Sequence, residues 1–282
     1  MRIAVTGSTG KLGSVVVREL RAAGHEVVAL DRVGAREPGF VQVDLSDHGQ
    51  VADALAGVQE VHSGLDAVVH LAAIPAPGIA SDVQTFRNNI LTTFDVFWAA
   101  IRAGVRRIVY ASSETVLGLP FDVPPPYIPV DEEYPARPES VYSLVKHLEE
   151  TLAVELVRWH PDLSITALRF SNVMHPEDYA VFPYDADPRE RKWNLWGYVD
   201  ARDGAQAIER ALETAGPGFD RFIVAAADTV TTRPNAELVE EVFPGVPLVR
   251  DLGDHDTLLA IDKARRVLGY EPRHSWRDTA RS

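Results

Sequence analysis

Short apolar runs, mostly of β-branched residues, alternate with longer amphipathic stretches through about the first 170 residues. Near-continuous apolar runs are typical of strands that are covered on both faces, and amphipathic stretches between them are typical of crossover helices. The pattern therefore predicts an α/β fold with a doubly wound parallel sheet. The expected strands are Arg2–Thr6, Glu26–Leu30, Phe40–Asp44, Ala67–Leu71, Arg107–Ala111 and Ser164–Phe170, and the clearest expected helices are Lys11–Ala23, Val83–Ala103 and Val141–His160.

Beyond Phe170 this alternation loosens into a stretch rich in Pro, Asp, Arg and Trp. It resumes as an expected helix near Asp203–Thr214 and an expected strand near Arg221–Ala226. We expect residues 1–170 to form the main domain and residues 171–282 to form a smaller lobe, interleaved with the last elements of that domain. Seven prolines between Leu117 and Pro138 exclude a helix or a central strand there, which predicts a long ordered loop or lid.

The composition excludes several classes of protein. The chain has 282 residues, of which 46% are hydrophobic, and this is enough for a packed core. There is no cysteine, so disulfides and thiolate chemistry are excluded, and the histidines show no spacing typical of metal ligands. A net charge of −13 disfavours nucleic acid and anionic membranes as partners. With no secretion signal and no long apolar stretch, we expect a cytoplasmic protein without a metal.

A glycine-rich turn follows the first predicted strand. It reads Gly7-Ser-Thr-Gly10-Lys11-Leu12-Gly13 and leads directly into a predicted helix. Glycines in this position let the backbone turn sharply and let a pyrophosphate approach the N–H groups at the start of the helix. The order of strand, glycine turn and helix therefore predicts a dinucleotide site that includes Gly7, Gly10, Lys11, Leu12 and Gly13.

The residues after the second and third strands bear on the identity of the dinucleotide. Asp31 lies at the end of the second strand, where a carboxylate accepts hydrogen bonds from the adenosine ribose and repels a 2′-phosphate. This favours NAD over NADP, although the adjacent Arg32 could offset part of the repulsion. Asp44 and Leu45, at the end of the third strand, are candidates for contact with the adenine.

One tyrosine and one lysine fall at the spacing Tyr-x-x-x-Lys, namely Tyr142 and Lys146. They share one face of a predicted helix, so the ammonium can lower the pKa of the phenol toward working pH and make it a usable base. The alternative is a tyrosine that merely packs on a lysine stem. A predicted strand ends beside Ser112 and Ser113, and a hydroxyl there can orient a substrate oxygen. Asn89, a poor helix former, could order a kink or a water for proton relay.

With these motifs the chain resembles the NAD-dependent epimerase/dehydratase family, the extended short-chain dehydrogenases. The matching stretches are residues 7–13, 70–73, 111–116, 142–146, 168–172, 198–203 and 261–270, together with Asn89. The resemblance implies a Rossmann-type NAD-binding domain in residues 1–170 and a substrate-binding lobe in residues 171–282. It implies that Tyr142 is the acid/base, that Lys146 binds the nicotinamide ribose and tunes Tyr142, and that Ser113 hydrogen-bonds the reacting oxygen.

The resemblance also bears on the cofactor groove and on assembly. It implies that Ala72, together with its neighbours Leu71 and Ala73, lines the cofactor groove, and that Asn89 contributes to the cofactor site. It further implies a homodimer that pairs through the helices predicted at 83–103 and 141–160, whose apolar faces are wide enough for such contact.

Departures from the family pattern narrow the substrate. Sugar dehydratases of the family carry an Asp-Glu pair where this chain has Glu114 and Thr115, which argues against dehydration. One remaining reading is a nucleotide-sugar 4-epimerase, in which hydride leaves the sugar for NAD and returns to the other face. The alternative is a uronate dehydrogenase acting on a free sugar acid. The compact stretch after Phe170 favours this alternative, whereas Glu114 stands where those enzymes have Asn. An NAD-sensing regulator stays open, although the intact catalytic residues argue against it.

Several further side chains are candidates for contact with the sugar. The basic cluster Arg189-Glu-Arg191-Lys192 could bind an anionic group, or could be a solvated run of charge. Trp193 and Trp196 could stack on a sugar ring or cover the lobe. The substrate-binding candidates are Pro75, Ser113, Glu114, Asn172, Arg191 and Lys192.

Overall fold

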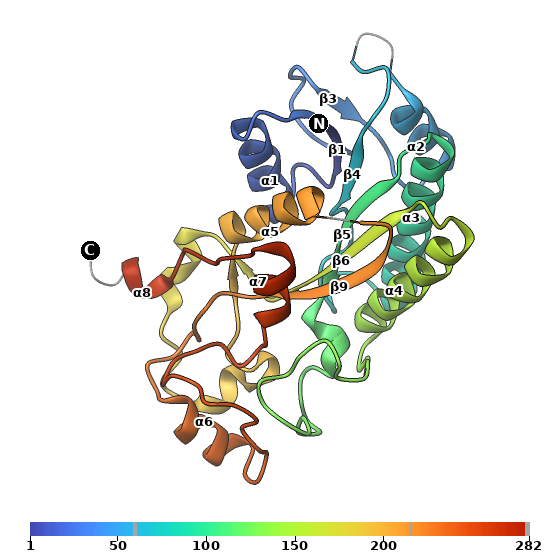
Figure 1. Cartoon of the computed structure of the whole chain (residues 1–282). Helices are drawn as coiled ribbons and strands as arrows, with labels where there is room; N and C mark the ends of the chain where they lie inside the picture. The colour runs from blue at the N-terminus through green and yellow to red at the C-terminus, as the bar shows by residue number, and fades with distance from the viewer. Residues whose placement is uncertain (59–60, 215, 280–282) are drawn as a thin grey trace.

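The computed structural model describes residues 1–58, 61–214 and 216–279. Seven of the strands in these ranges form one parallel sheet (Figure 1). Across the sheet the strands are β3 (Phe40–Gln42), β2 (Glu26–Asp31), β1 (Arg2–Thr6), β4 (Ala67–His70), β5 (Arg107–Ser113), β6 (Ser164–Phe170) and β9 (Gly218–Val224). The strand order reverses between β1 and β4, and ligands of doubly wound sheets bind in the crevice at the carboxyl ends of strands beside such a reversal.

Helices cover both faces of the sheet. One face carries α2 (His48–Ala56), α3 (Asp82–Arg102) and α4 (Val141–Trp159), and the other carries α1 (Lys11–Ala22), α5 (Ala201–Thr214) and α7 (Asp262–Leu268) (Figure 1). Successive residues of β1 enter opposite cores: Ala4 packs beneath α2, α3 and α4, whereas Ile3 and Val5 pack beneath α1 and α5. Burial on both faces explains the continuous apolar runs of the strands and confirms the predicted α/β fold.

The predicted elements agree closely with the structure. The bounds of β1 and β6 are those predicted, and each of α1, α3 and α4 begins and ends within one residue of its predicted bounds. The strand β5 continues two residues beyond the predicted end, to Ser113. Helix α2 was not among the clearest predicted helices; it begins at the capping residue Asp47, whose side chain accepts hydrogen bonds from two backbone N–H groups of its first turn.

The segments after β6 both complete the sheet and build a separate layer beside it. The smaller elements there are β7 (Val173–Met174), η2 (Pro176–Val181), η3 (Pro188–Asn194), β8 (Val199–Asp200), α6 (Asn235–Val242) and α8 (Trp276–Thr279). Their buried side chains, such as Trp196 and Phe243, belong to the same hydrophobic core as Val16 of α1. The lobe is therefore continuous with the core on the α1 side of the sheet. Residues 215 and 280–282 of the predicted lobe lie outside the described residues.

The proline-rich segment is an ordered loop, as predicted. Within residues 118–140, all of which the structure describes, the chain forms neither a helix nor a strand of the main sheet. Ile128 and Val130 are fully buried and make parallel backbone bridges to Leu248 and Leu259 of the lobe. The loop thus covers the core near the carboxyl ends of the strands. Among the described helices, none is both long enough and apolar enough to span a bilayer.

Candidate active site

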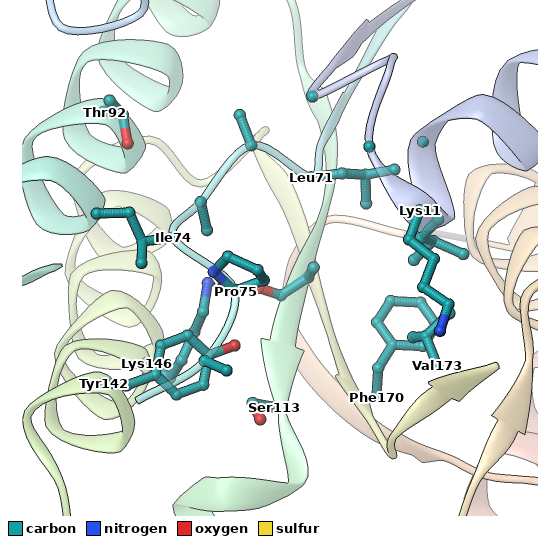
Figure 2. A pocket seen from close by; sticks show the side chains of 18 of the residues that line it. Lys11, Leu71, Ile74, Pro75, Thr92, Ser113, Tyr142, Lys146, Phe170 and Val173 are labelled. Carbon is teal, nitrogen blue, oxygen red and sulfur yellow. Dashed lines mark hydrogen bonds between the residues drawn. The ribbon is translucent and has the colours of Figure 1, made fainter. Parts of the chain in front are cut away.

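A cavity of ≈ 740 Å³ lies at the carboxyl ends of β1, β4, β5 and β6. Figure 2 shows its two sides: Tyr142, Lys146 and Ser113 on one, and Lys11, Phe170 and Val173 on the other. Most of the residues that the sequence singled out line this one space. They are Gly7, Gly10, Lys11, Leu12, Gly13, Asp31, Arg32, Asp44, Leu45, Leu71, Ala72, Ala73, Pro75, Ser113, Glu114, Tyr142, Lys146 and Asn172.

The glycine turn has no room for side chains. Gly7 has a φ of +67°, and a Cβ built on it would lie 2.7 Å from the Ala72 nitrogen. A Cβ on Gly13 would lie 2.0 Å from the Gly7 oxygen. The turn ends at Gly10, which begins α1 without a side-chain cap, so the first N–H groups of the helix are left for a ligand. These residues fit the pyrophosphate of a dinucleotide.

Asp31 is held at the opposite edge of the same turn. Its carboxylate accepts hydrogen bonds from the Thr9 backbone N–H at 3.0 Å, from the Thr9 hydroxyl at 2.8 Å and from the Arg32 N–H at 2.7 Å. These bonds fix the carboxylate at the cavity wall, where ribose hydroxyls can donate to it. Asp44, further along the wall, accepts from the Ser46 hydroxyl and N–H, which lower the pKa of its carboxyl.

Tyr142 and Lys146 lie in the first two turns of α4, and the Lys146 Nζ is 5.9 Å from the centre of the Tyr142 ring. Both side chains are buried. Lys146 donates to the Ala111 oxygen of β5 at 2.9 Å, which ties the helix to the strand that ends at Ser113. Burial raises the pKa of Tyr142 above its ordinary value, although the Lys146 ammonium lowers it. Lys146 thus lowers the pKa of Tyr142, as predicted, but the upward shift caused by burial is larger.

Glu114 is the second buried ionisable group beside Ser113. Its side chain is 3% exposed, and its Oε1 accepts a hydrogen bond of 3.3 Å from the Asn194 amide. Its Oε2 is buried with no protein partner. Burial raises the pKa of Glu114 to about 7, although the hydrogen bond from the Asn194 amide opposes the shift. A carboxyl group that changes charge near neutral pH therefore lies next to the Ser113 hydroxyl.

The cavity lining does not include Asn89, Arg191 or Lys192. Asn89 is fully buried behind the wall, where its amide accepts from the Ile74 N–H at 2.8 Å and donates to the Ile74 oxygen at 3.0 Å. It therefore clamps the loop that carries Pro75 onto helix α3. Arg191 is buried and donates to the Gly197 oxygen at 3.0 Å. Lys192 makes an ion pair with Asp122 at 2.7 Å.

The two tryptophans of the lobe have different environments. Trp193 lines the cavity, and the guanidinium of Arg191 lies 4.8 Å from the centre of its ring. Trp196 is fully buried and donates to the Pro188 oxygen at 2.9 Å. The first therefore offers an aromatic face to a ligand, whereas the second packs in the core.

Sequence reasoning missed several lining residues. They are Thr9, Val43, Ser46, Ile74, Ala76, Pro77, Asn88, Thr92, Ala111, Thr115, Phe170, Ser171 and Val173. The spacing of Asn88 and Thr92 was a usable signal, because polar residues four apart on a predicted helix share one face. Most of the others lie in loops, where no periodic pattern marks a lining position. The described residues contain no cluster of three or more His, Asp or Glu side chains arranged to hold a metal ion.

A glycine cradle, an acidic ribose-side residue and a Tyr-Lys-Ser group in one cavity define a dinucleotide-dependent oxidoreductase. A profile of the NAD dependent epimerase/dehydratase family matches residues 3–225, and the chain belongs to this family. It is an enzyme of the extended short-chain dehydrogenase type, and its cofactor is NAD.

The chain is similar to sugar epimerases over most of its length. It is 28% identical to a UDP-glucose 4-epimerase of Corynebacterium glutamicum, over 98% of this chain and 92% of the relative. It is 27% identical to a UDP-glucose 4-epimerase of Rhizobium leguminosarum bv. trifolii, over 99% and 95%. The similarity therefore extends beyond the cofactor-binding half.

Solved structures with the same fold include enzymes of more than one activity. A UDP-galactose 4-epimerase matches with a TM-score of 0.70 and 29% identity, over 100% of this chain and 99% of that chain. A short-chain dehydrogenase/reductase superfamily protein of Agrobacterium tumefaciens with bound NAD matches at 0.72 and 26%, over 98% and 94%. A mutated uronate dehydrogenase matches at 0.69 and 25%, over 99% and 84%.

Asp31→Ala tests the role of the acidic residue at the ribose side. We expect NAD to bind roughly ten-fold more weakly, because a charge-assisted hydrogen bond contributes about 1.5 to 3 kcal/mol, and NADP to lose less because a repulsive charge is also removed. Isothermal titration of both dinucleotides measures the two changes. Glu37→Gln is the control, since Glu37 is exposed and outside the cavity. An equal loss for both dinucleotides contradicts the assignment.

Glu114→Gln tests the buried carboxyl. Because its pKa is about 7 in the folded protein and about 4.5 when unfolded, the wild type loses stability as pH rises through this interval. The glutamine variant escapes that loss. We compare the free energy of unfolding of the variant with that of the wild type at each pH. Between pH 5 and pH 8 we expect this difference to shift by about 2 to 3 kcal/mol in favour of the variant.

Urea unfolding at the two pH values gives this difference directly. The exposed Glu190→Gln is the matched control, and its stability relative to wild type should change little with pH. A Glu114→Gln variant whose relative stability is the same at pH 5 and pH 8 is incompatible with a buried carboxyl that titrates near neutrality.

Proposed function

We propose that this enzyme oxidises a sugar hydroxyl with NAD, in a reaction of the nucleotide-sugar 4-epimerase or sugar dehydrogenase kind. The observation that carries the proposal is the convergence of Tyr142, Ser113 and Lys146 on the cavity that also contains the glycine turn. A base, an orienting hydroxyl and a fixed cation within reach of one dinucleotide site are what removal of a hydroxyl proton during oxidation requires.

The dinucleotide is held by this chain's own backbone and one carboxylate. The N–H groups at the start of α1 would hold its pyrophosphate, and Asp31 would accept hydrogen bonds from its ribose. When bound, NAD supplies the site with an acceptor for the hydride of the substrate carbon. Ala72, which approaches Gly7 closely, lines the same cavity.

The three catalytic side chains bind the substrate hydroxyl and accept its proton. Ser113 hydrogen-bonds the reacting oxygen and holds it toward the phenol. Tyr142, as phenolate, accepts the hydroxyl proton, and Lys146 stabilises that phenolate by its charge. In the reverse direction the phenol returns its proton to the forming hydroxyl. Both Tyr142 and Lys146 are shielded from solvent, which strengthens these interactions.

Similarity to sugar epimerases supports a nucleotide sugar as substrate. The relatives of Corynebacterium and Rhizobium are UDP-glucose 4-epimerases, and the alignments cover more than nine-tenths of each. The same cavity is also lined by Pro75, Asn172 and Trp193, which offer an apolar edge, an amide and an aromatic face to a sugar. The position of Thr115 beside Glu114 gives no second carboxylate for dehydration.

Oxidation of a free uronate is the second candidate function. The similarity to a uronate dehydrogenase structure favours it, but Glu114 lies in the cavity beside Ser113 and, when ionised, repels an acidic sugar. A regulator that binds NAD without turnover is the third reading, and it leaves the buried Tyr142 and Lys146 without a use.

A substrate panel separates the three readings. Purified enzyme with NAD is given UDP-glucose, UDP-galactose, glucuronate and galacturonate, with NADH absorbance and product stereochemistry by NMR as the two readouts. We expect interconversion of the UDP-sugars without net accumulation of NADH. Accumulation of NADH with a uronate supports the second function instead, and NAD binding without either change supports the regulator.

Tyr142→Phe removes the proposed base. We expect turnover of the active substrate to fall about 10³-fold, in the range lost with a general base, and NAD affinity to stay within a few-fold. Initial rates and isothermal titration provide the two values. Tyr127→Phe is the control, because the Tyr127 hydroxyl bonds to Asp131 in the proline-rich loop. Unimpaired turnover by the Tyr142 variant contradicts the mechanism.

We also propose that a second copy of the chain packs on the outer faces of α3 and α4. Exposed apolar side chains are concentrated there, including Phe86, Leu91, Phe94, Leu144 and Val154. An apolar patch of this kind is typical of an interface. Leu91 is 53% exposed, and Leu91→Glu should convert a dimer to a monomer in sedimentation equilibrium, whereas Val181→Glu, at an exposed position on η2, should not. A monomeric wild type contradicts this proposal.

A further inference from the structure

The inward face of α4 buries a carboxylate that the proposed mechanism does not use. Glu149 lies one helical turn after Lys146, and its Oε2 accepts a hydrogen bond of 2.9 Å from the Lys146 Nζ. The two side chains are 0% and 4% exposed, so the ion pair is shielded from water. A buried pair of this kind persists only if its remaining hydrogen-bonding capacity is met.

The other oxygen of Glu149 ends a chain of buried hydrogen bonds. Its Oε1 accepts from the Thr93 hydroxyl of α3 at 2.9 Å, and that hydroxyl oxygen is 3.1 Å from Nε2 of His70. The His70 Nδ1 is 2.7 Å from the hydroxyl of Thr6 at the end of β1. The Thr6 oxygen in turn accepts from the Leu71 N–H at 3.2 Å. The chain thus links α4, α3, β4 and β1.

The hydrogen bonds of this buried series all donate in one direction. Burial, with the nearby Lys146 charge, lowers the pKa of His70 to about 3, so the ring is neutral and carries a single proton. The Leu71 N–H can only donate, which leaves the Thr6 hydroxyl proton for the His70 Nδ1. The His70 Nε2–H then donates to Thr93, and Thr93 donates to Glu149. Every donor therefore points toward Glu149. Burial raises the pKa of this carboxyl above its ordinary value, and the Lys146 charge and the hydrogen bonds from Lys146 and Thr93 oppose that shift by stabilising the ionised form.

An ionised Glu149 opposes the effect of Lys146 on Tyr142. Although desolvation lowers it, the Glu149 charge raises the pKa of Lys146, which keeps the ammonium charged. The pKa of Tyr142 is raised first by burial; the ammonium lowers it, and the Glu149 carboxylate raises it again. The positive charge beside the phenol is thus partly cancelled.

We propose that Glu149 is a positioning residue, which fixes Lys146 beside Tyr142 and offsets part of its charge, so that the pH range in which Tyr142 accepts a proton is moved upward. This inference rests on the proposed function, in which Tyr142 is the base. Both carboxylate oxygens of Glu149 make the hydrogen bonds that this role requires, one to Lys146 and one to Thr93.

Other ionisable groups near the pair have partners of their own. Glu150, on the same helix, forms two hydrogen bonds with Arg169 of β6 at 2.9 and 2.7 Å and accepts a third from Ser112 of β5. Burial raises the pKa of Glu150, but Arg169, the Ser112 hydroxyl and, to a smaller extent, the charge of Arg221 of β9 lower it by more. Tyr110 of β5 is the exception: its hydroxyl is buried without a hydrogen-bond partner among the described residues, and burial raises its pKa.

Glu114 of η1 also acts on the phenol and has a pKa that burial raises to about 7. It titrates in both the wild type and a Glu149 variant. A difference between the two proteins therefore reports the charge at position 149.

The test is a titration of Tyr142 that requires no substrate. Tyrosinate absorbance is followed against pH, in short pH jumps, with Tyr142→Phe as the baseline that isolates this one phenol. In Glu149→Gln we expect the Tyr142 midpoint to fall by on the order of one pH unit, because a buried negative charge close to the phenol is removed. The acid limb of kcat against pH should move the same way.

Two further variants separate charge from structure. Glu149→Asp keeps the charge and should return the midpoint most of the way to wild type. Glu155→Gln, in the outer face of the same helix where Glu155 is half-exposed and pairs with Arg158, should leave it unchanged. A general loosening of α4 would affect the glutamine and aspartate variants at position 149 alike, whereas an electrostatic role restores the midpoint only with aspartate.

The outcomes separate this inference from the proposed function. A lower Tyr142 midpoint in Glu149→Gln without turnover on any sugar supports Glu149 and contradicts the function. Turnover with an unchanged midpoint and acid limb overturns the role of Glu149 and leaves the function standing. If Glu149→Gln does not fold, the titration of Tyr142 in the wild-type protein tests the inference instead. A Tyr142 midpoint below the ordinary value of about 10 in the free protein means that Lys146 is not offset, and overturns the inference.

Discussion

Charges on the sheet-facing side of α4 can be buried only in pairs, because the transfer of a single ion into the interior costs several kcal/mol. Lys146 pairs with Glu149 of the same helix, and Glu150 pairs with Arg169 of β6. Lys146 also donates to a backbone oxygen of β5. These bonds fix the position of α4 along the sheet, and this places Tyr142 beside the end of the strand that carries the serine of the site.

The elements that could be predicted from the sequence are those whose signal is local. The apolar runs gave β1 and β6 with their bounds, because strands covered on both faces need no alternation. The glycine turn was predictable for a similar reason: Gly7 and Gly13 touch backbone atoms of neighbouring segments and admit no side chain. Position in the strand order then brings Tyr142 and Ser113 to the same crevice.

The parts that could not be predicted depend on contacts between distant segments. Arg191 and Lys192 are adjacent in the sequence, yet one is buried against the ring of Trp193 and the other reaches Asp122 in the proline-rich loop. From the pattern of charges alone, these two positions cannot be told apart from side chains that bind an anion. Likewise, the burial of Glu149 depends on residues of α3 and β4 that no spacing in the sequence relates to it.

The packing of α1 against α5 has a consequence for how the chain reaches this structure. Helix α1 ends at Ala22, whereas α5 begins only at Ala201 and the last strand of the sheet ends at Val224. During synthesis, the part of α1 that packs against α5 therefore stays uncovered until about four-fifths of the polypeptide has been made. Such a long separation in sequence slows closure of this core and prolongs the exposure of its apolar surface.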